Sequence, residues 1–255
     1  MSDPPAIEAV DLTRRFGGFV AVDHVNFAVP AGEFRAIIGP NGAGKTTLFN
    51  LLMHALEPSA GRVRLFGEDI TDIPEHERSH LGLARSFQSN QLFTEQSLLE
   101  NVRIVAQTVE QGPLSFDLFR VGERVALDRA HEILEVVGLS ELADRTAKNL
   151  SHGDQRLLGI AMAIATDPDV LLLDEPTSGM GPGETERTAE LIADIRDDLG
   201  LTLLMIEHDM EVVLSQSDRI TVLHGGQVLA TGTPTEIQDN DAVQEAYLGG
   251  LTEGI

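Results

Sequence analysis

Apolar and polar residues alternate along three segments near the start of the chain, at 6–16, 21–29 and 33–39. Alternation of this kind, with many β-branched residues, is typical of β-strands. A glycine-rich turn comes next, and an apolar helical pattern then extends from Gly44 to about Leu56. We therefore expect an antiparallel β piece built from the N-terminal strands, followed by a turn and a helix.

The middle of the chain has a different pattern. After a strand and turn at 61–70, the residues from about 74 to 145 carry helical periodicity and little strand signal. The stretch 126–139 has the apolar stripe of an amphipathic helix, which Gly138 is placed to end. We expect a helical subdomain at about residues 79–145, inserted in a single domain formed by all 255 residues.

Strand and helix patterns alternate again in the last third. Apolar runs at 170–176 and 201–208 flank a helical pattern at 184–199, and the pair 219–224 and 227–232 is typical of a hairpin. Alternating units with nearly continuous apolar strands predict an α/β fold, with a mostly parallel sheet that is covered on both faces.

Composition narrows the class of protein. The chain has no cysteine, which excludes a disulfide framework and thiolate metal sites. Its 18 basic and 41 acidic residues give a formal charge of −23, which argues against a general affinity for nucleic acid. Lys45 and Lys148 are the only lysines, and the other basic residues are arginines. An ordinary solvated acidic surface and a salt-rich cytoplasm both explain this balance.

The sequence also bears on location. No apolar run approaches the ~18 residues of a membrane span. The first residues, MSDPPAIEAV, lack the basic and long apolar segments of a secretory signal. We therefore expect a soluble, cytoplasmic protein that reaches a membrane only through a partner.

A phosphate-binding loop is the strongest motif. Residues 39–46 read GPNGAGKT, which matches G-x-x-x-x-G-K-[ST] between a strand pattern and a helix pattern. The backbone amides can wrap phosphates, Lys45 can reach the terminal ones, and Thr46 can bind Mg²⁺, so ATP and Mg²⁺ are the expected ligands. The residues expected to bind the nucleotide here are Gly39, Pro40, Asn41, Gly42, Ala43, Gly44, Lys45, Thr46 and Thr47.

Two further apolar strands end in polar residues. The run VLLLDE at 170–175 delivers two carboxylates to a strand end, where α/β sheets bind ligands. Asp174 is placed to hold the magnesium, and Glu175 to polarise an attacking water. His208 follows the next strand and would reach the γ-phosphate region. A lone histidine is more often structural, but these neighbouring motifs favour the catalytic role.

Two residues have weaker local signals. Gln88 lies where the sheet meets the helical block, and its amide oxygen can face magnesium or water. A glutamine at a loop start is otherwise a plain surface residue. Phe16 precedes the phosphate-binding loop and could stack on adenine, although a core phenylalanine fits the local sequence nearly as well.

A second anion site is predicted at 150–158, which read LSHGDQRLL. Ser151 is a good N-cap, and the first amides of a helix attract anions because they have no partner within it. One phosphate group needs only one phosphate-binding loop. A second anion-binding site is explained if it contacts the nucleotide that is bound to another subunit.

The segment LSHGD resembles the signature motif of ABC-type ATPases, which is usually written LSGGQ. Phe16, GPNGAGKT, Gln88, LSHGD, VLLLDEP and His208 follow one another in the order of that family, over nearly the whole chain. The resemblance implies a P-loop ATPase core with an N-terminal antiparallel β subdomain and an inserted helical subdomain. It also implies that Ser151 and Gly153 contact the γ-phosphate bound to a second subunit.

The resemblance extends to a subgroup. IEHDMEVV, AYLGG and the long insert before Ser151 are similar to ATPase subunits of importers for branched-chain and related amino acids or amides. GMGPGETERTAEL is similar to urea-importer relatives, and GTPTEI…AYLG is shared with lipopolysaccharide-exporter ATPases. The expected function is ATP hydrolysis that powers an importer of branched-chain or related amino acids. The alternatives are a urea or short-amide importer and a soluble ABC ATPase without a transport role.

This family implies a second ATPase subunit, two membrane permeases and an external binding protein, with the chain on the inner face of the membrane. The single phosphate-binding loop and the acidic charge argue against a soluble ATPase of translation or DNA repair. Glu175 and His208 argue against a non-hydrolysing subunit. The chain departs from the usual motifs at His152 and Asp154, which replace a glycine and a glutamine, and at Gly181, where many members carry aspartate.

Overall fold

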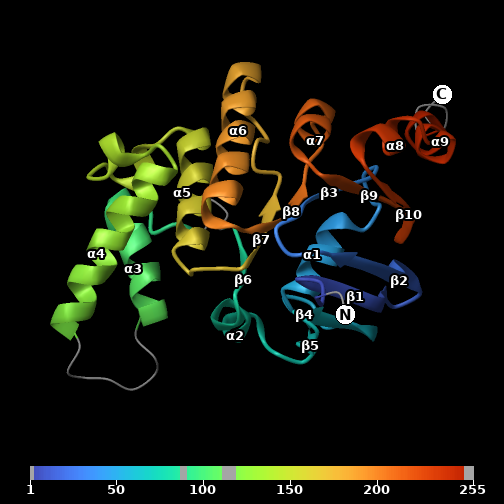
Figure 1. The fold of residues 1–255 in the computed structure, drawn as a ribbon, viewed down its shortest axis with the longest axis horizontal. Helices are drawn as coiled ribbons and strands as arrows, with labels where there is room; N and C mark the ends of the chain where they lie inside the picture. The colour runs from blue at the N-terminus through green and yellow to red at the C-terminus, as the bar shows by residue number, and fades with distance from the viewer. Residues whose placement is uncertain (1–2, 87–90, 111–118, 250–255) are drawn as a thin grey trace.

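The computed structural model describes residues 3–86, 91–110 and 119–249. The predicted ligand Gln88 lies outside these described residues. An antiparallel sheet forms from the N-terminal part of the chain, with strands in the order β2-β1-β4-β5 (Figure 1). Its strands are β1 (Ile7–Phe16), β2 (Phe19–Val29), β4 (Ala60–Leu65) and β5 (Glu68–Asp69).

A six-stranded sheet in the order β10-β9-β3-β8-β7-β6 forms the centre of the molecule. Only the β9–β10 pair of this sheet is antiparallel, as the predicted hairpin requires. β3 belongs to this sheet and not to the N-terminal one, because all five of its residues are buried between two covered faces. The strands are β3 (Phe34–Ile38), β6 (Leu83–Arg85), β7 (Val170–Asp174), β8 (Thr202–Ile206), β9 (Arg219–His224) and β10 (Gln227–Gly232).

Helices cover both faces of the central sheet. In Figure 1, α5, α6 and α7 lie above it, while α1 lies between it and the antiparallel sheet. α1 ends at Leu52, four residues before the predicted end. The helices are α1 (Lys45–Leu52), α2 (Glu75–Arg78), α3 (Leu98–Glu110), α4 (Phe119–Val136), α5 (His152–Ile164), α6 (Pro182–Leu199), α7 (Met210–Gln216), α8 (Pro234–Gln238) and α9 (Asp241–Gly249). Within the described ranges, none of them is long and apolar enough to cross a membrane.

Successive side chains of the parallel strands contribute to two hydrophobic clusters, one on each face of the central sheet. On β7, Leu171 and Leu173 join a buried cluster with α5 and α6, while Val170 and Leu172 join a cluster with α1 and the antiparallel sheet. Successive side chains of a strand point to opposite faces, so a strand covered on both sides must be apolar throughout. This burial explains the continuous apolar runs in the sequence.

The helices α3 and α4 pack against α5 at one end of the molecule (Figure 1). Val102, Ala130 and Leu158, one from each helix, are fully buried in the same cluster. The range 79–145 that we predicted for the helical subdomain also contains β6, which pairs with β7 in the central sheet. The subdomain limits themselves stay a prediction.

A buried arginine joins the antiparallel sheet to α1. Arg78 is fully buried, and its guanidinium donates to the carbonyl oxygens of Ile73 at 2.8 Å, Ile70 at 2.6 Å and Thr71 at 3.0 Å, and to that of Leu52 at the end of α1. Burial lowers the pKa of Arg78 to about 10. Among the described residues, no carboxylate forms an ion pair with it.

Candidate nucleotide-binding and hydrolysis site

The predicted functional motifs meet at one edge of the central sheet. β3, β8 and β7 are neighbours and run parallel, so their carboxyl ends lie together. The loop 39–46 follows β3, Asp174 and Glu175 stand at the end of β7, and His208 follows β8. This edge is where open α/β sheets bind ligands.

The phosphate-binding loop surrounds a buried lysine. Lys45 begins α1, and its ammonium group donates to the carbonyl oxygens of Gly39 at 2.7 Å and Pro40 at 3.3 Å. Burial lowers the pKa of Lys45, while the nearby charges of Glu175 and Asp174 act in the opposite direction. The charged amine is therefore stabilised by both carboxylates.

Gly44 is required for the close packing of this loop. Its φ of +101° is a conformation that residues with a side chain rarely adopt. A Cβ atom there would stand 2.4 Å from the carbonyl oxygen of Ala21 on β2. The absence of a side chain lets α1 begin directly behind the loop.

Glu175 has an unusual backbone conformation that several contacts hold. Its φ is +50°, which costs roughly 1–3 kcal/mol for a residue other than glycine. Its amide donates to Ile206 at 2.9 Å, and its carbonyl oxygen accepts from Arg156 of α5 and from the amide of Ser178 at 3.2 Å. His208 Nε2 lies 2.8 Å from Glu175 Oε1. The two residues predicted to be catalytic are therefore in direct contact.

Glu207 is a functional candidate that we did not predict. Its side chain is 3% exposed, and Oε1 accepts hydrogen bonds from the amide of Thr177, at 3.0 Å, and from its hydroxyl. Oε2 accepts from the amide of His208 at 2.8 Å. The carboxylate thus fixes the segment after Glu175 to the segment that carries His208. A charged residue at the end of an apolar strand is the signal that could have identified it.

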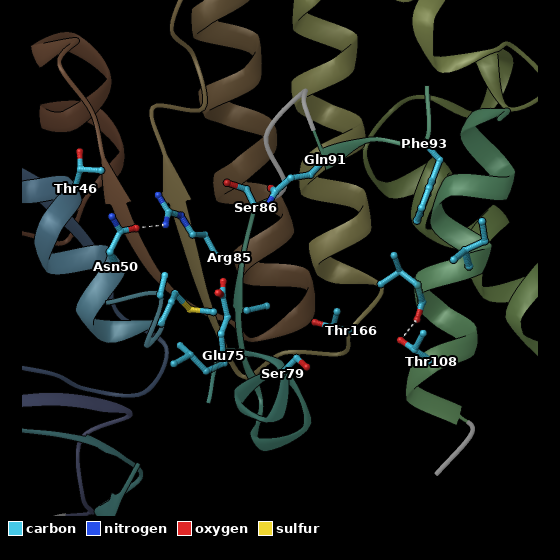
Figure 2. A pocket seen from close by; sticks show the side chains of 16 residues that line it. Thr46, Asn50, Glu75, Ser79, Arg85, Ser86, Gln91, Phe93, Thr108 and Thr166 are labelled. Atoms are coloured by element: carbon cyan, nitrogen blue, oxygen red, sulfur yellow. Dashed lines mark hydrogen bonds between the residues drawn. The ribbon is translucent and has the colours of Figure 1, made fainter. Parts of the chain in front are cut away.

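Asp174 is paired with an arginine that we also did not predict. Arg85, the last residue of β6, donates to Asp174 Oδ2 and, at 2.7 Å, to Asn50 Oδ1 on α1. Both side chains of the ion pair are mostly buried, with 16% and 11% exposure. Figure 2 shows the Arg85–Asn50 contact at the edge of a groove described below.

The donors at this edge fit magnesium bound together with a nucleotide. The Thr46 hydroxyl is exposed at the start of α1, and Asp174 supplies a carboxylate, and both are oxygen ligands of the kind that Mg²⁺ prefers. Over the described ranges, no group of three or more histidine, cysteine or acidic side chains forms a cage for a metal ion.

The signature segment begins α5, as predicted. Ser151 is the N-cap, and its hydroxyl oxygen accepts from the amide of Asp154 at 3.1 Å. A Cβ atom at Gly153 would stand 2.1 Å from Glu184 Oε1 on α6, so a larger residue here would displace the end of that side chain. The His152 side chain is exposed. Sequence patterns did not indicate the contact between α5 and α6.

Phe16 is a surface residue and not a core phenylalanine. Its side chain is 45% exposed at the end of β1, and the guanidinium carbon of Arg14 lies 4.7 Å from the ring centre. The ring is therefore available to stack on a flat ligand. Its adenine role stays a prediction, as do the ligand roles of the other site residues.

Comparison with known proteins assigns the chain to a family. Residues 22–178 match the ABC transporter family, and residues 227–250 match the branched-chain amino acid ATP-binding cassette transporter family. The chain is 44% identical over 251 residues to BraF of Pseudomonas aeruginosa, a high-affinity branched-chain amino acid transport ATP-binding protein, with 96% of this chain and 98% of BraF covered. Its identity to LivG of Escherichia coli, which has the same description, is 43% with the same coverage.

Solved structures agree with this assignment. An ATP-binding cassette of an ABC transporter in its ADP conformation has a TM-score of 0.84 and 31% identity, covering 98% of this chain and all of that one. A dimeric cassette in a post-hydrolysis state with ADP and Pi has a TM-score of 0.76 and 26% identity, covering 89% and 98%. The chain belongs to the ABC transporter family, as the sequence motifs indicated. It is an ATP-binding subunit of the kind whose ATPase activity powers transport.

Proposed function

We propose that this chain hydrolyses ATP to power an importer of branched-chain amino acids. The contact between His208 and Glu175, beside Lys45 and Asp174, is the observation that supports hydrolysis. The names of BraF and LivG support the substrate class. A urea or short-amide importer is the second candidate, because the segment GMGPGETERTAEL favours it.

Each residue of the site has a role in this proposal. The loop amides and Lys45 hold the phosphates, and Phe16 stacks on adenine. Thr46 and Asp174, together with Gln88, hold Mg²⁺, which draws charge from the phosphates when it is bound. Glu175 takes a proton from the attacking water, and His208 holds that carboxylate and reaches the γ-phosphate.

The proposal includes several partners. Membrane permeases follow from the transport role of the relatives, and we propose two of them, together with an external binding protein and attachment at the inner face of the membrane. A second ATPase subunit would receive the signature segment with Ser151 and Gly153. The dimeric state of a related cassette supports this arrangement.

A groove beside the site is our candidate surface for the permease. It has a volume of about 690 Å³ and lies between α1, β6 and α3 (Figure 2). Phe93 is 43% exposed at this groove, and Ile104 lines it from α3. Arg85 and Thr46 line it on the side of the nucleotide site, so an occupant would lie beside the residues that hold the metal.

Ile104→Asp is expected to uncouple transport in a complex of this chain with its permeases. Placing a carboxylate in an apolar contact removes binding energy, so transport should fall about tenfold or more. The ATPase rate of the isolated subunit should stay within about twofold, because Ile104 lies on α3, and Lys45, Glu175 and His208 lie outside that helix. Val125→Asp, at an exposed apolar position on α4, is the control that should change neither rate. Equal losses in both variants would rule out the groove.

Labelled leucine and labelled urea distinguish the two substrate classes. The complex, reconstituted in vesicles with its binding protein, should accumulate leucine in an ATP-dependent manner and exclude urea. ATP-dependent uptake of urea without uptake of leucine would overturn the substrate assignment and leave the ATPase role intact.

The melting temperature and ATPase rate are expected to rise with KCl into the molar range. The charge of −23 opposes the compact state and the approach of two subunits that carry ATP. Raising KCl from ~0.1 M to ~1 M shortens the screening distance from about 10 Å to about 3 Å and weakens this repulsion. Calorimetry and phosphate release measure both effects. A melting temperature that is flat or falling over this range would favour an ordinary acidic surface.

A further inference from the structure

Arg85 connects three parts of the molecule that act on the nucleotide. It ends β6, donates to Asn50 on α1 at 2.7 Å, and forms an ion pair with Asp174 at the end of β7. Asn50 lies one turn after Thr46 on the helix that follows the phosphate-binding loop. Arg85 also lines the groove, as Figure 2 shows.

Burial makes Asp174 depend on its ion pair with Arg85. Both side chains are at least four-fifths buried, and a charge in such a place needs a counter-ion. The pair therefore neutralises Asp174 when no metal is present. A magnesium ion bound at the same carboxylate would meet a guanidinium only one hydrogen bond away, and the two cations repel each other.

We propose that Arg85 is a positioning residue that competes with Mg²⁺ for Asp174. It holds the carboxylate in place as its counter-ion in the metal-free protein and weakens the pull of that carboxylate on the metal. The inference rests on the proposed function, because it takes Asp174 as a metal ligand. Asn50 keeps the guanidinium between α1 and β7, so Arg85 remains beside the carboxylate throughout the exchange.

The effect of Arg85 is measurable as a metal preference. We define this preference as the Kd for ADP in EDTA divided by the Kd for ADP in excess Mg²⁺, both from titration calorimetry of the full chain. Arg85→Met removes the competing charge, so the preference should rise on the order of tenfold, within the usual range of couplings between bound groups. Without metal, the variant should melt at a lower temperature than the wild type, because Asp174 loses its counter-ion. Adding MgADP should raise the melting temperature of the variant more than it raises that of the wild type.

Three further single variants and one double variant make the result specific. Arg85→Lys keeps the charge and should retain the wild-type preference, while Arg85→Gln is neutral and should raise it even if Arg85→Met does not fold. Arg196→Met removes an arginine of similar exposure, 18%, that pairs with Asp218 away from the site, and should lower stability without changing the preference. In an Asp174→Asn background, Arg85→Met should have no further effect.

The outcomes separate this inference from the proposed function. A wild-type chain that binds ADP in neither condition would overturn both. A wild-type chain that binds ADP, with an unchanged or lower preference in the neutral Arg85 variants, would overturn the competition alone. A rise of equal size in Arg196→Met or in the Asp174→Asn background would also overturn it, because the effect would then not act through Asp174.

Discussion

Glu175→Gln is expected to keep ATP affinity within about twofold and to lose turnover by about 10³-fold, in the range measured for loss of a general base. The amide cannot accept a proton from water, while Lys45 and the loop amides still hold the phosphates. Because hydrolysis no longer separates the subunits, an ATP-bound dimer should accumulate. Nucleotide titration, phosphate release and size-exclusion chromatography with ATP measure the three quantities.

Glu190→Gln is a matched control for this variant. It makes the same carboxylate-to-amide change at an exposed position of α6, and all three quantities should equal those of the wild type. A Glu175→Gln protein that hydrolyses ATP at nearly the wild-type rate would show that another group acts as the base. Loss of ATP affinity would instead show that Glu175 supports the binding site.

Ser151→Arg is expected to leave ATP binding by the monomer unchanged, while dimerisation and turnover fall on the order of 10²-fold. This is the size of loss that follows when one contact to a charged oxygen in a transition state is removed. Ser151 is exposed at the start of α5, in a segment that we assign to the nucleotide of the second subunit. A long charged side chain there would crowd the γ-phosphate and block closure. Analytical ultracentrifugation with ATP and phosphate release measure the losses.

Two variants test whether the loss at Ser151 reflects its place in the dimer. Ser151→Ala removes the N-cap, a loss of about 1 kcal/mol, without adding bulk, so its effect should be smaller than that of arginine. His152→Gly should be mild, because this side chain is exposed. Loss of ATP affinity in monomeric Ser151→Arg would place the motif at its own subunit's nucleotide and contradict the two-subunit arrangement.

Local patterns predicted the main elements because local causes produce them. β7 and β8 are buried on both faces, and their continuous apolar runs follow from that burial. The N-cap at Ser151 is a local hydrogen bond to Asp154, three residues on, and short-range periodicity is enough to identify it. The hairpin of β9 and β10 is likewise fixed by neighbouring residues.

The features that escaped prediction depend on distant parts of the chain. β6 has three residues, too few to show alternation, and it is a strand only because β7 lies beside it. Arg85 meets Asp174 across 89 positions, and Glu207 meets Thr177 across 30. The contact of Gly153 with Glu184 arises from the packing of α5 against α6. None of these partners leaves a periodic signal in the sequence.

The buried Arg78 has a consequence for the engineering of this chain. Four of its partners, on the turn after β5 and at the end of α1, are carbonyl oxygens, which neither accept a proton in mild acid nor lose their hydrogen bonds to added salt. The fifth, His54 Nδ1, lies 3.4 Å from the guanidinium. The four carbonyl contacts therefore keep their strength over a range of pH and salt in which the ion pairs on the surface change. A lysine could not replace it, because a single ammonium has three donors and no planar fork. Surface charges other than Glu75, whose carboxylate favours the charged form of Arg78, can therefore be redesigned for dilute media without weakening the contact between the antiparallel sheet and the phosphate-binding helix.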